Sequence, residues 1–245
     1  MKAIFIGFFV ALSVPFHLIG QELSKGTLRM EVEKIMLNGE EAPTDMGAHL
    51  GNISISLYAD GVRQKTEFSM MMMNNTTYYD TRNDSIRLYM DLMGKKYLIA
   101  DTRSSIAAKS SKSGMEGPKI EVKEDRNDVK EILGFQCYKV YVKVKADKEG
   151  KSLEVPEDIE LKLYVTDKLK FDASYVTNGK TSIDLKGTPL EYNMRMGGSG
   201  FQMEMIMVAK EFKAEVDSAV FDYPTGNYKI YDMESFQMEM SKMGK

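Results

Sequence analysis

Strict alternation of side chains is the feature that most constrains how this chain folds. Between residues 138 and 145 every second side chain is aromatic or aliphatic, and the intervening ones are lysine or tyrosine. Residues 159–165 repeat the pattern with isoleucine, leucine and valine. Because successive side chains of a strand point to opposite faces, this period of two predicts strands with one buried face and one face in water. The polar turn 147–151 between the two runs predicts an antiparallel hairpin.

Further short runs with turn signals between them extend this prediction along the chain. Asp60-Gly61 is a strong hairpin-turn pair, and the run that follows it continues to Met73. The other predicted strands are 27–37, 52–58, 76–81, 86–92, 97–101, 189–196, 201–208, 216–223 and 228–231. The chain is therefore expected to be mainly β and antiparallel.

Two segments depart from the alternation. Residues 103–119 are rich in serine and glycine, which predicts a loop or short helix that could act as a flap. Residues 232–244 place Met233, Phe236 and Met240 at helical spacing, which predicts a helix.

The first residues have the pattern of a signal peptide. Lys2 precedes an apolar run from Ala3 to Val14, which is shorter than the roughly 20 residues of a transmembrane helix. We therefore expect residues 1–20 to be a signal peptide, residues 21–245 to be a single domain, and the product to be periplasmic or secreted. No later run is long enough to span a membrane.

Charge and cysteine content narrow the function. The net charge is −3, so the chain lacks the basic surface typical of nucleic-acid binding. One cysteine, Cys137, excludes an intrachain disulfide and a cysteine-cluster zinc site. We expect Cys137 to be a small buried hydrophobic residue.

Catalytic motifs are absent from the sequence. His49 is the only histidine after residue 20, and no phosphate-binding loop, dinucleotide-binding glycine motif or His-Glu-x-x-His motif occurs. Carboxylates are plentiful, but nothing singles out a catalytic pair. We therefore predict a protein that is not an enzyme and has no cofactor.

Two stretches resemble a known group of proteins. The segment from Ile132 to Val140 (ILGFQCYKV) resembles a motif of exported bacterial proteins of the GLPGLI type, a family of unknown function. The segment from Phe221 to Lys229 (FDYPTGNYK) resembles their closing motif, with Asn227 as an insertion.

That resemblance implies an architecture similar to the lipoprotein carriers of the LolA type. The implied fold is a curved antiparallel sheet, an incomplete barrel, with one or two short helices packed in or across its concave face. It implies an apolar groove for an acyl chain or apolar peptide, and no catalytic residues.

Methionine is unusually abundant. Residues 21–245 contain 19 methionines and only 15 leucines, although leucine is normally among the commonest residues. Three interpretations stay open. Methionine fills an ordinary core, or lines an adaptable apolar groove, or binds Cu(I) through clustered thioethers. The candidate copper ligands are Met194, Met196, Met203 and Met205.

The sequence thus predicts an exported binding protein that holds a lipid, an acyl chain or an apolar peptide. The expected groove lining is Tyr138, Val140, Val142, Leu161, Leu163, Met203, Met205 and Met207. The alternatives are a Cu(I)-binding protein and an envelope module that binds a protein partner through its edge strands.

Overall fold

A computed structural model describes most of the chain. The described residues are 22–43, 53–70, 73–92, 94–112, 119–145, 159–177, 183–198 and 201–243. The predicted signal peptide, His49, the turn 147–151 and part of the predicted flap (113–118) lie outside them.

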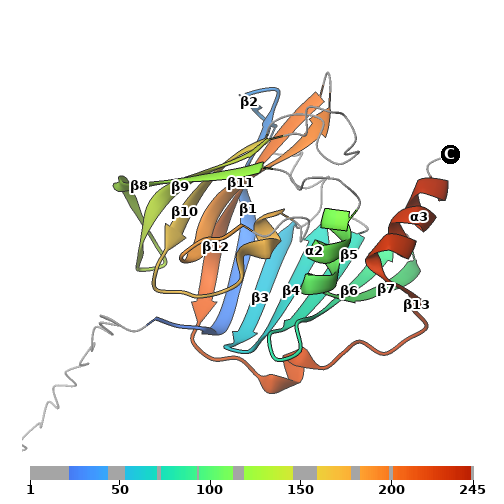
Figure 1. Ribbon diagram of the computed structural model, residues 1–245. Helices are drawn as coiled ribbons and strands as arrows, with labels where there is room; N and C mark the ends of the chain where they lie inside the picture. Colours follow the sequence, from blue (N-terminus) through green and yellow to red (C-terminus); the bar gives the residue numbers. More distant parts are fainter. Residues whose placement is uncertain are drawn as a thin grey trace, which may run out of the picture.

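The chain forms one open, mostly antiparallel sheet (Figure 1). The first strands are β1 (Lys25–Leu37), β2 (Glu40–Glu41), β3 (Ser54–Asp60), β4 (Arg63–Met70), β5 (Met73–Asp80), β6 (Ser85–Leu92) and β7 (Lys95–Thr102). The others are β8 (Lys119–Ile132), β9 (Phe135–Lys145), β10 (Ile159–Thr166), β11 (Thr188–Gly198), β12 (Phe201–Lys213) and β13 (Lys229–Tyr231). Their order is β13-β7-β6-β5-β4-β3-β1-β12-β11-β10-β9-β8, with β2 beside β1. The predicted mainly-β class is confirmed.

Strand β1 joins two series of sequential hairpins. It pairs with β3 on one side and with β12 on the other, and both pairings are antiparallel. The β1–β12 register shifts twice, between Arg29 and Met30 and between Val32 and Lys34. Such bulges bend a strand and increase its twist, which contributes to the curvature of the sheet (Figure 1).

The concave face carries the core. Phe171, Tyr175 and Ile183 belong to a segment, here called the plug (residues 167–177 and 183–187), that packs on the β9–β12 half of this face. The plug includes the short helix η1 (Ala173–Thr177). On the β6–β7 half, Phe236 of α3 (Met233–Met243) packs against Tyr97. Helices η1 and α3 therefore lie on the concave side of the sheet, as expected (Figure 1).

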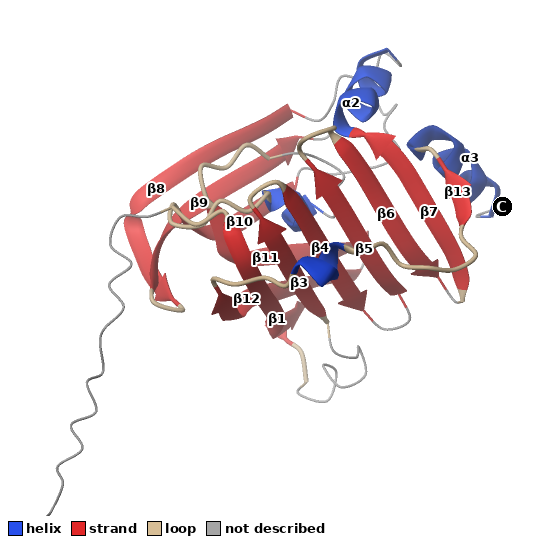
Figure 2. Ribbon diagram, turned by 90° about the horizontal axis from the view of Figure 1, so that it is seen from below, coloured by secondary structure: helices blue, strands red, loops and turns tan. Residues whose placement is uncertain are grey.

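The predicted strand 216–223 is wrong. Residues 214–228, here called the strap, cross the face of the sheet opposite the plug and include η2 (Ser218–Phe221) (Figure 2). The Asp217 carboxylate accepts a hydrogen bond from the Ala219 amide, which caps η2. The Tyr78 hydroxyl donates to the Asp222 carbonyl at 3.0 Å. These contacts favour a turn over an extended strand.

Two other segments refine the predictions. Residues Arg103–Lys112 form helix α2, so the described part of the serine-rich segment is a short helix and not a loop. The predicted C-terminal helix is confirmed, since α3 covers Met233–Met243. The charged stretch 121–131 lies within strand β8. A strand at the edge of a sheet can carry charges at most positions, so it shows little alternation. No helix in the described part of the chain is long and apolar enough to cross a membrane.

The buried thiol gives a first prediction. Cys137 is 0% exposed, and burial raises its pKa to about 12. The thiolate, which is the reactive form, is therefore scarce up to pH 9. We expect no reaction of the folded protein with Ellman's reagent at pH 8, and one reactive thiol per chain when the protein is unfolded in 6 M guanidinium. Rapid labelling of the folded chain would contradict this burial.

Candidate functional site

The predicted groove residues lie together on the concave face. Val140 is opposite Leu163, Leu163 is opposite Tyr192, and Tyr192 is opposite Met207. All eight predicted residues belong to one core cluster and are at most 8% exposed. Alternation alone was sufficient to find them, because residues of one parity share a face. Whether they line a ligand groove stays a prediction.

The plug covers these residues and is held by paired hydrogen bonds. The Asp172 amide donates to Gln64 Oε1 at 2.7 Å, and Gln64 Nε2 donates to the Asp172 carbonyl at 3.0 Å. The Phe171 amide donates to Thr188 Oγ1 at 2.9 Å, and the Tyr175 hydroxyl donates to the Pro189 carbonyl at 2.6 Å. The plug is therefore attached to both halves of the sheet.

An ion pair extends this attachment to α2. Arg103 Nη1 lies 2.7 Å from Asp172 Oδ2. The Arg103 guanidinium also stacks on the Tyr79 ring, 3.6 Å from its centroid. Planar stacking and a carboxylate contact together hold an arginine in one orientation. The start of α2, the plug and β5 are thus joined at one point.

A cleft of about 280 Å³ opens between the plug and the ends of β3, β4 and β5. Its apolar lining includes Ala59, Phe171 and Leu185, of which the first two are 4% exposed. The remaining lining residues are Ser24, Gly61, Val62, Arg63, Gln64, Tyr79, Thr81, Lys170, Asp172 and Gly187. The cleft therefore combines an apolar floor with a polar rim.

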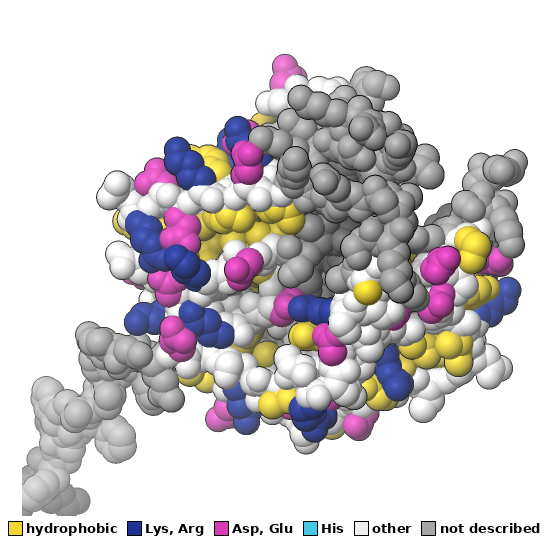
Figure 3. All heavy atoms as spheres, viewed as in Figure 1, with side chains coloured by type: hydrophobic (Ala, Val, Ile, Leu, Met, Phe, Trp, Pro, Cys, Tyr) yellow, Lys and Arg dark blue, Asp and Glu magenta, His cyan; other side chains and the backbone are white. Residues whose placement is uncertain are grey.

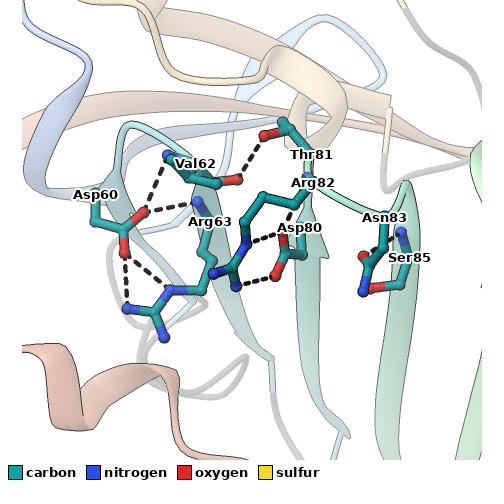
Figure 4. Close-up of polar contacts among 8 residues, drawn as sticks. All are labelled: Asp60, Val62, Arg63, Asp80, Thr81, Arg82, Asn83 and Ser85. Atoms are coloured by element: carbon teal, nitrogen blue, oxygen red, sulfur yellow. Dashed lines mark hydrogen bonds and ion pairs between the residues drawn. The ribbon is translucent and has the colours of Figure 1, made fainter.

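The rim is built by two adjoining hairpin turns (Figure 4). The Asp60 carboxylate accepts hydrogen bonds from the Val62 and Arg63 amides and pairs with the Arg63 guanidinium at 2.7 Å. The Thr81 amide and hydroxyl both donate to the Val62 carbonyl. Partial burial by itself would raise the pKa of the Asp60 carboxyl, but the hydrogen bonds from Arg63 hold it below its usual value. The rim is therefore fixed by its own contacts.

The sequence prediction missed this cleft. None of the eight predicted residues lines it. Its lining comes from residues 24, 59, 61–64, 79, 81, 170–172, 185 and 187, which lie in segments far apart in sequence and share no motif. Phe171 connects the two regions, because it lines the cleft and also belongs to the core cluster that contains Met205 and Met207.

One buried hydroxyl has no partner. Tyr192 is 1% exposed, and within the described part of the chain its hydroxyl makes no hydrogen bond. Burial raises the pKa of Tyr192 well above its usual value. An unpaired buried hydroxyl costs about 1–3 kcal/mol, so it is a rare feature of a stable core.

The four candidate copper ligands are neighbours in the sheet register. Met194 is opposite Met205, and Met196 is opposite Met203. Directly opposed residues have Cβ atoms about 4.5–5.5 Å apart. Met203 and Met205 are 8% and 0% exposed. Among the described residues, no cluster of three or more histidine, cysteine, aspartate or glutamate side chains is placed to hold a metal.

No family model and no curated protein matches the chain. The resemblance to the GLPGLI-type proteins thus stays at the level of two short motifs. Among solved structures, the chain is similar to the lipoprotein LppX of Mycobacterium tuberculosis, with a TM-score of 0.33 and 8% identity, covering 80% of this chain and 89% of that one. LprF of Mycobacterium bovis gives a TM-score of 0.31 and 10% identity, covering 82% and 90%. Both similarities are distant.

The anchoring of the plug can be tested at Gln64. Gln64→Leu keeps the size of the side chain but removes both hydrogen bonds to Asp172, so we expect a loss of about 1–3 kcal/mol in the free energy of unfolding. Amide exchange in residues 171–177 should also accelerate. The control is Gln136→Leu, at an exposed position. Equal effects of the two substitutions would show that the plug does not depend on this pair.

Proposed function

We propose that the protein is an exported binding protein, without catalytic activity, that holds a lipid, an acyl chain or an apolar peptide against its concave face. The cleft at the plug carries this proposal, because it gives solvent a route to Phe171 and so to the margin of the apolar core. Its volume of about 280 Å³ lies just below the range typical of ligand sites, which is about 300–1,000 Å³.

The chemistry of the cleft favours an apolar tail with an uncharged head. The floor consists of Ala59, Phe171 and Leu185. Each CH₂ group of a ligand that is buried against it stabilises the complex by roughly 0.8 kcal/mol. The charges at the rim already have partners: Arg63 pairs with Asp60, Lys170 with Glu22 and Asp172 with Arg103. A charged head would have to compete with these pairs.

Tyr192 supports a site that extends beneath the plug. Its ring packs edge-on against Tyr175 of η1, with centroids 5.9 Å apart. A polar atom of a ligand that reached this depth would satisfy the unpaired hydroxyl. The neighbouring Met207 is unbranched and flexible, which suits a wall that adapts to different chains.

The proposal is tested by filling the cleft. Leu185→Trp adds bulk at a lining position, so we expect the uncharged fluorescent probe N-phenyl-1-naphthylamine to bind at least about tenfold more weakly, a change of about 1.4 kcal/mol. The matched control is Leu133→Trp at a site that is 42% exposed and does not line the cleft.

Saturable binding to the wild-type chain and to the control, but not to the cleft variant, would support the proposal. Native mass spectrometry of protein purified from its own envelope should show a retained apolar adduct. Absence of saturable probe binding by the wild-type chain would contradict the proposal, and so would full binding by Leu185→Trp.

Cu(I) binding is a second candidate, which the pairing of Met194 with Met205 and of Met196 with Met203 favours. Soft thioether ligands are selective for Cu(I). Under this function, anaerobic titration against a chelator should show one copper ion per chain, lost in Met205→Leu and kept in Met30→Leu. Met30 is equally buried but lies outside the four-methionine group. Equal titrations of both variants would exclude the site.

A further inference from the structure

Strand β8 is a long open edge of the sheet. It covers Lys119–Ile132, stands at one end of the strand order and pairs with β9 alone among the described strands. The opposite edge, β13, has only three residues. Open edge strands present unpaired backbone donors and acceptors to a partner. Val122, in the first half of β8, is 42% exposed although it is opposite Val142, which is 0% exposed.

The charge pattern around Val122 is complementary to itself. In an antiparallel pair of two β8 strands centred on Val122, Glu121 is opposite Lys123 of the second copy. Val122 then meets Val122, and Ile120 meets Glu124. By the symmetry of the pair, every favourable charge contact occurs twice.

Neighbouring registers lack this match. Centring the pair on Glu121 places Glu121 against itself, and centring it on Lys123 places Lys123 against itself and Glu121 against Asp125. Like charges directly opposite each other destabilise a sheet. A shift of the partner strand by a single residue would instead place the concave face of one copy beside the convex face of the other. The charges of β8 therefore select one register.

We propose that two copies of this chain associate through antiparallel pairing of residues 119–125 of β8, which continues the sheet from one copy into the other. The bulge between Asp125 and Val129 limits the contact, because it interrupts the ladder there. Arg126, at the bulge, is engaged by Glu124 and Asp167 of its own chain. Positively and negatively charged side chains lie next to each other at this side of the molecule, on the left of Figure 3.

This proposal is independent of the ligand. The cleft lies at the ends of β3, β4 and β5, whereas β8 is the last strand of the sheet. Seven residues a side make a small contact compared with the roughly 800 Å² per partner of stable complexes. We therefore expect a weak dimer that is populated at protein concentrations of about 100 μM.

Charge reversal tests the register in the full chain. By sedimentation equilibrium, Glu121→Lys and Lys123→Glu should each weaken the dimer about tenfold, since each places two like-charge pairs at the contact. The double variant E121K/K123E restores opposite charges across the axis and should return to within about threefold of the wild type. Glu131→Lys, on the same strand outside the contact, is the control.

Cross-linking tests the axis by a second route. Two residues on the axis face each other at a Cα distance of about 4.5–5.5 Å, which a disulfide spans. We expect Val122→Cys to oxidise to a covalent dimer, and Val129→Cys, which is 50% exposed but off the axis, to stay monomeric. A monomeric wild type at about 100 μM, or a dimer that is unchanged by both single charge reversals, would overturn the proposal.

Discussion

The attachment of the plug to the concave face is the contact on which the rest of the structure depends. The reciprocal hydrogen bonds between Gln64 and Asp172 tie the plug to β4, and the Phe171 amide ties it to Thr188 of β11. At Gly187 a Cβ atom would lie 2.1 Å from the Thr166 carbonyl oxygen, so only glycine allows this close approach. Without the plug, the aliphatic and methionine rows of β9 to β12 would face water.

The same contact creates the candidate site. Because the plug meets the sheet at Asp172, the space between that point and the β3–β4 turn stays open, with Phe171 at its inner wall. The ion pair of Arg63 with Asp60 holds the turn on one side of the opening, and that of Arg103 with Asp172 holds the plug on the other. One small group of residues thus determines both the access to the core and the stability of the plug.

The strands and their buried faces could be predicted, since Val140, Leu163 and Met207 each follow a period of two that backbone geometry imposes on any strand. The interpretation failed where that pattern is absent or misleading. Strand β8 lies at the open edge of the sheet, where charged side chains are tolerated at most positions, so its sequence shows little alternation. In residues 216–223 the contacts of Asp217 and Asp222 favour a turn over a strand. The cleft was missed because Leu185, Arg63 and Ser24 meet only after folding.

The sequence by itself determined the class of fold and the side chains that leave water, because alternation and turn residues act between neighbours in the chain. The tertiary structure decided what those side chains meet. It placed an irregular segment, the plug, over them, laid the strap across the opposite face and left β8 at the margin. These outcomes depend on contacts such as that between Gln64 and Asp172, which are 108 residues apart, and no local pattern encodes such a meeting.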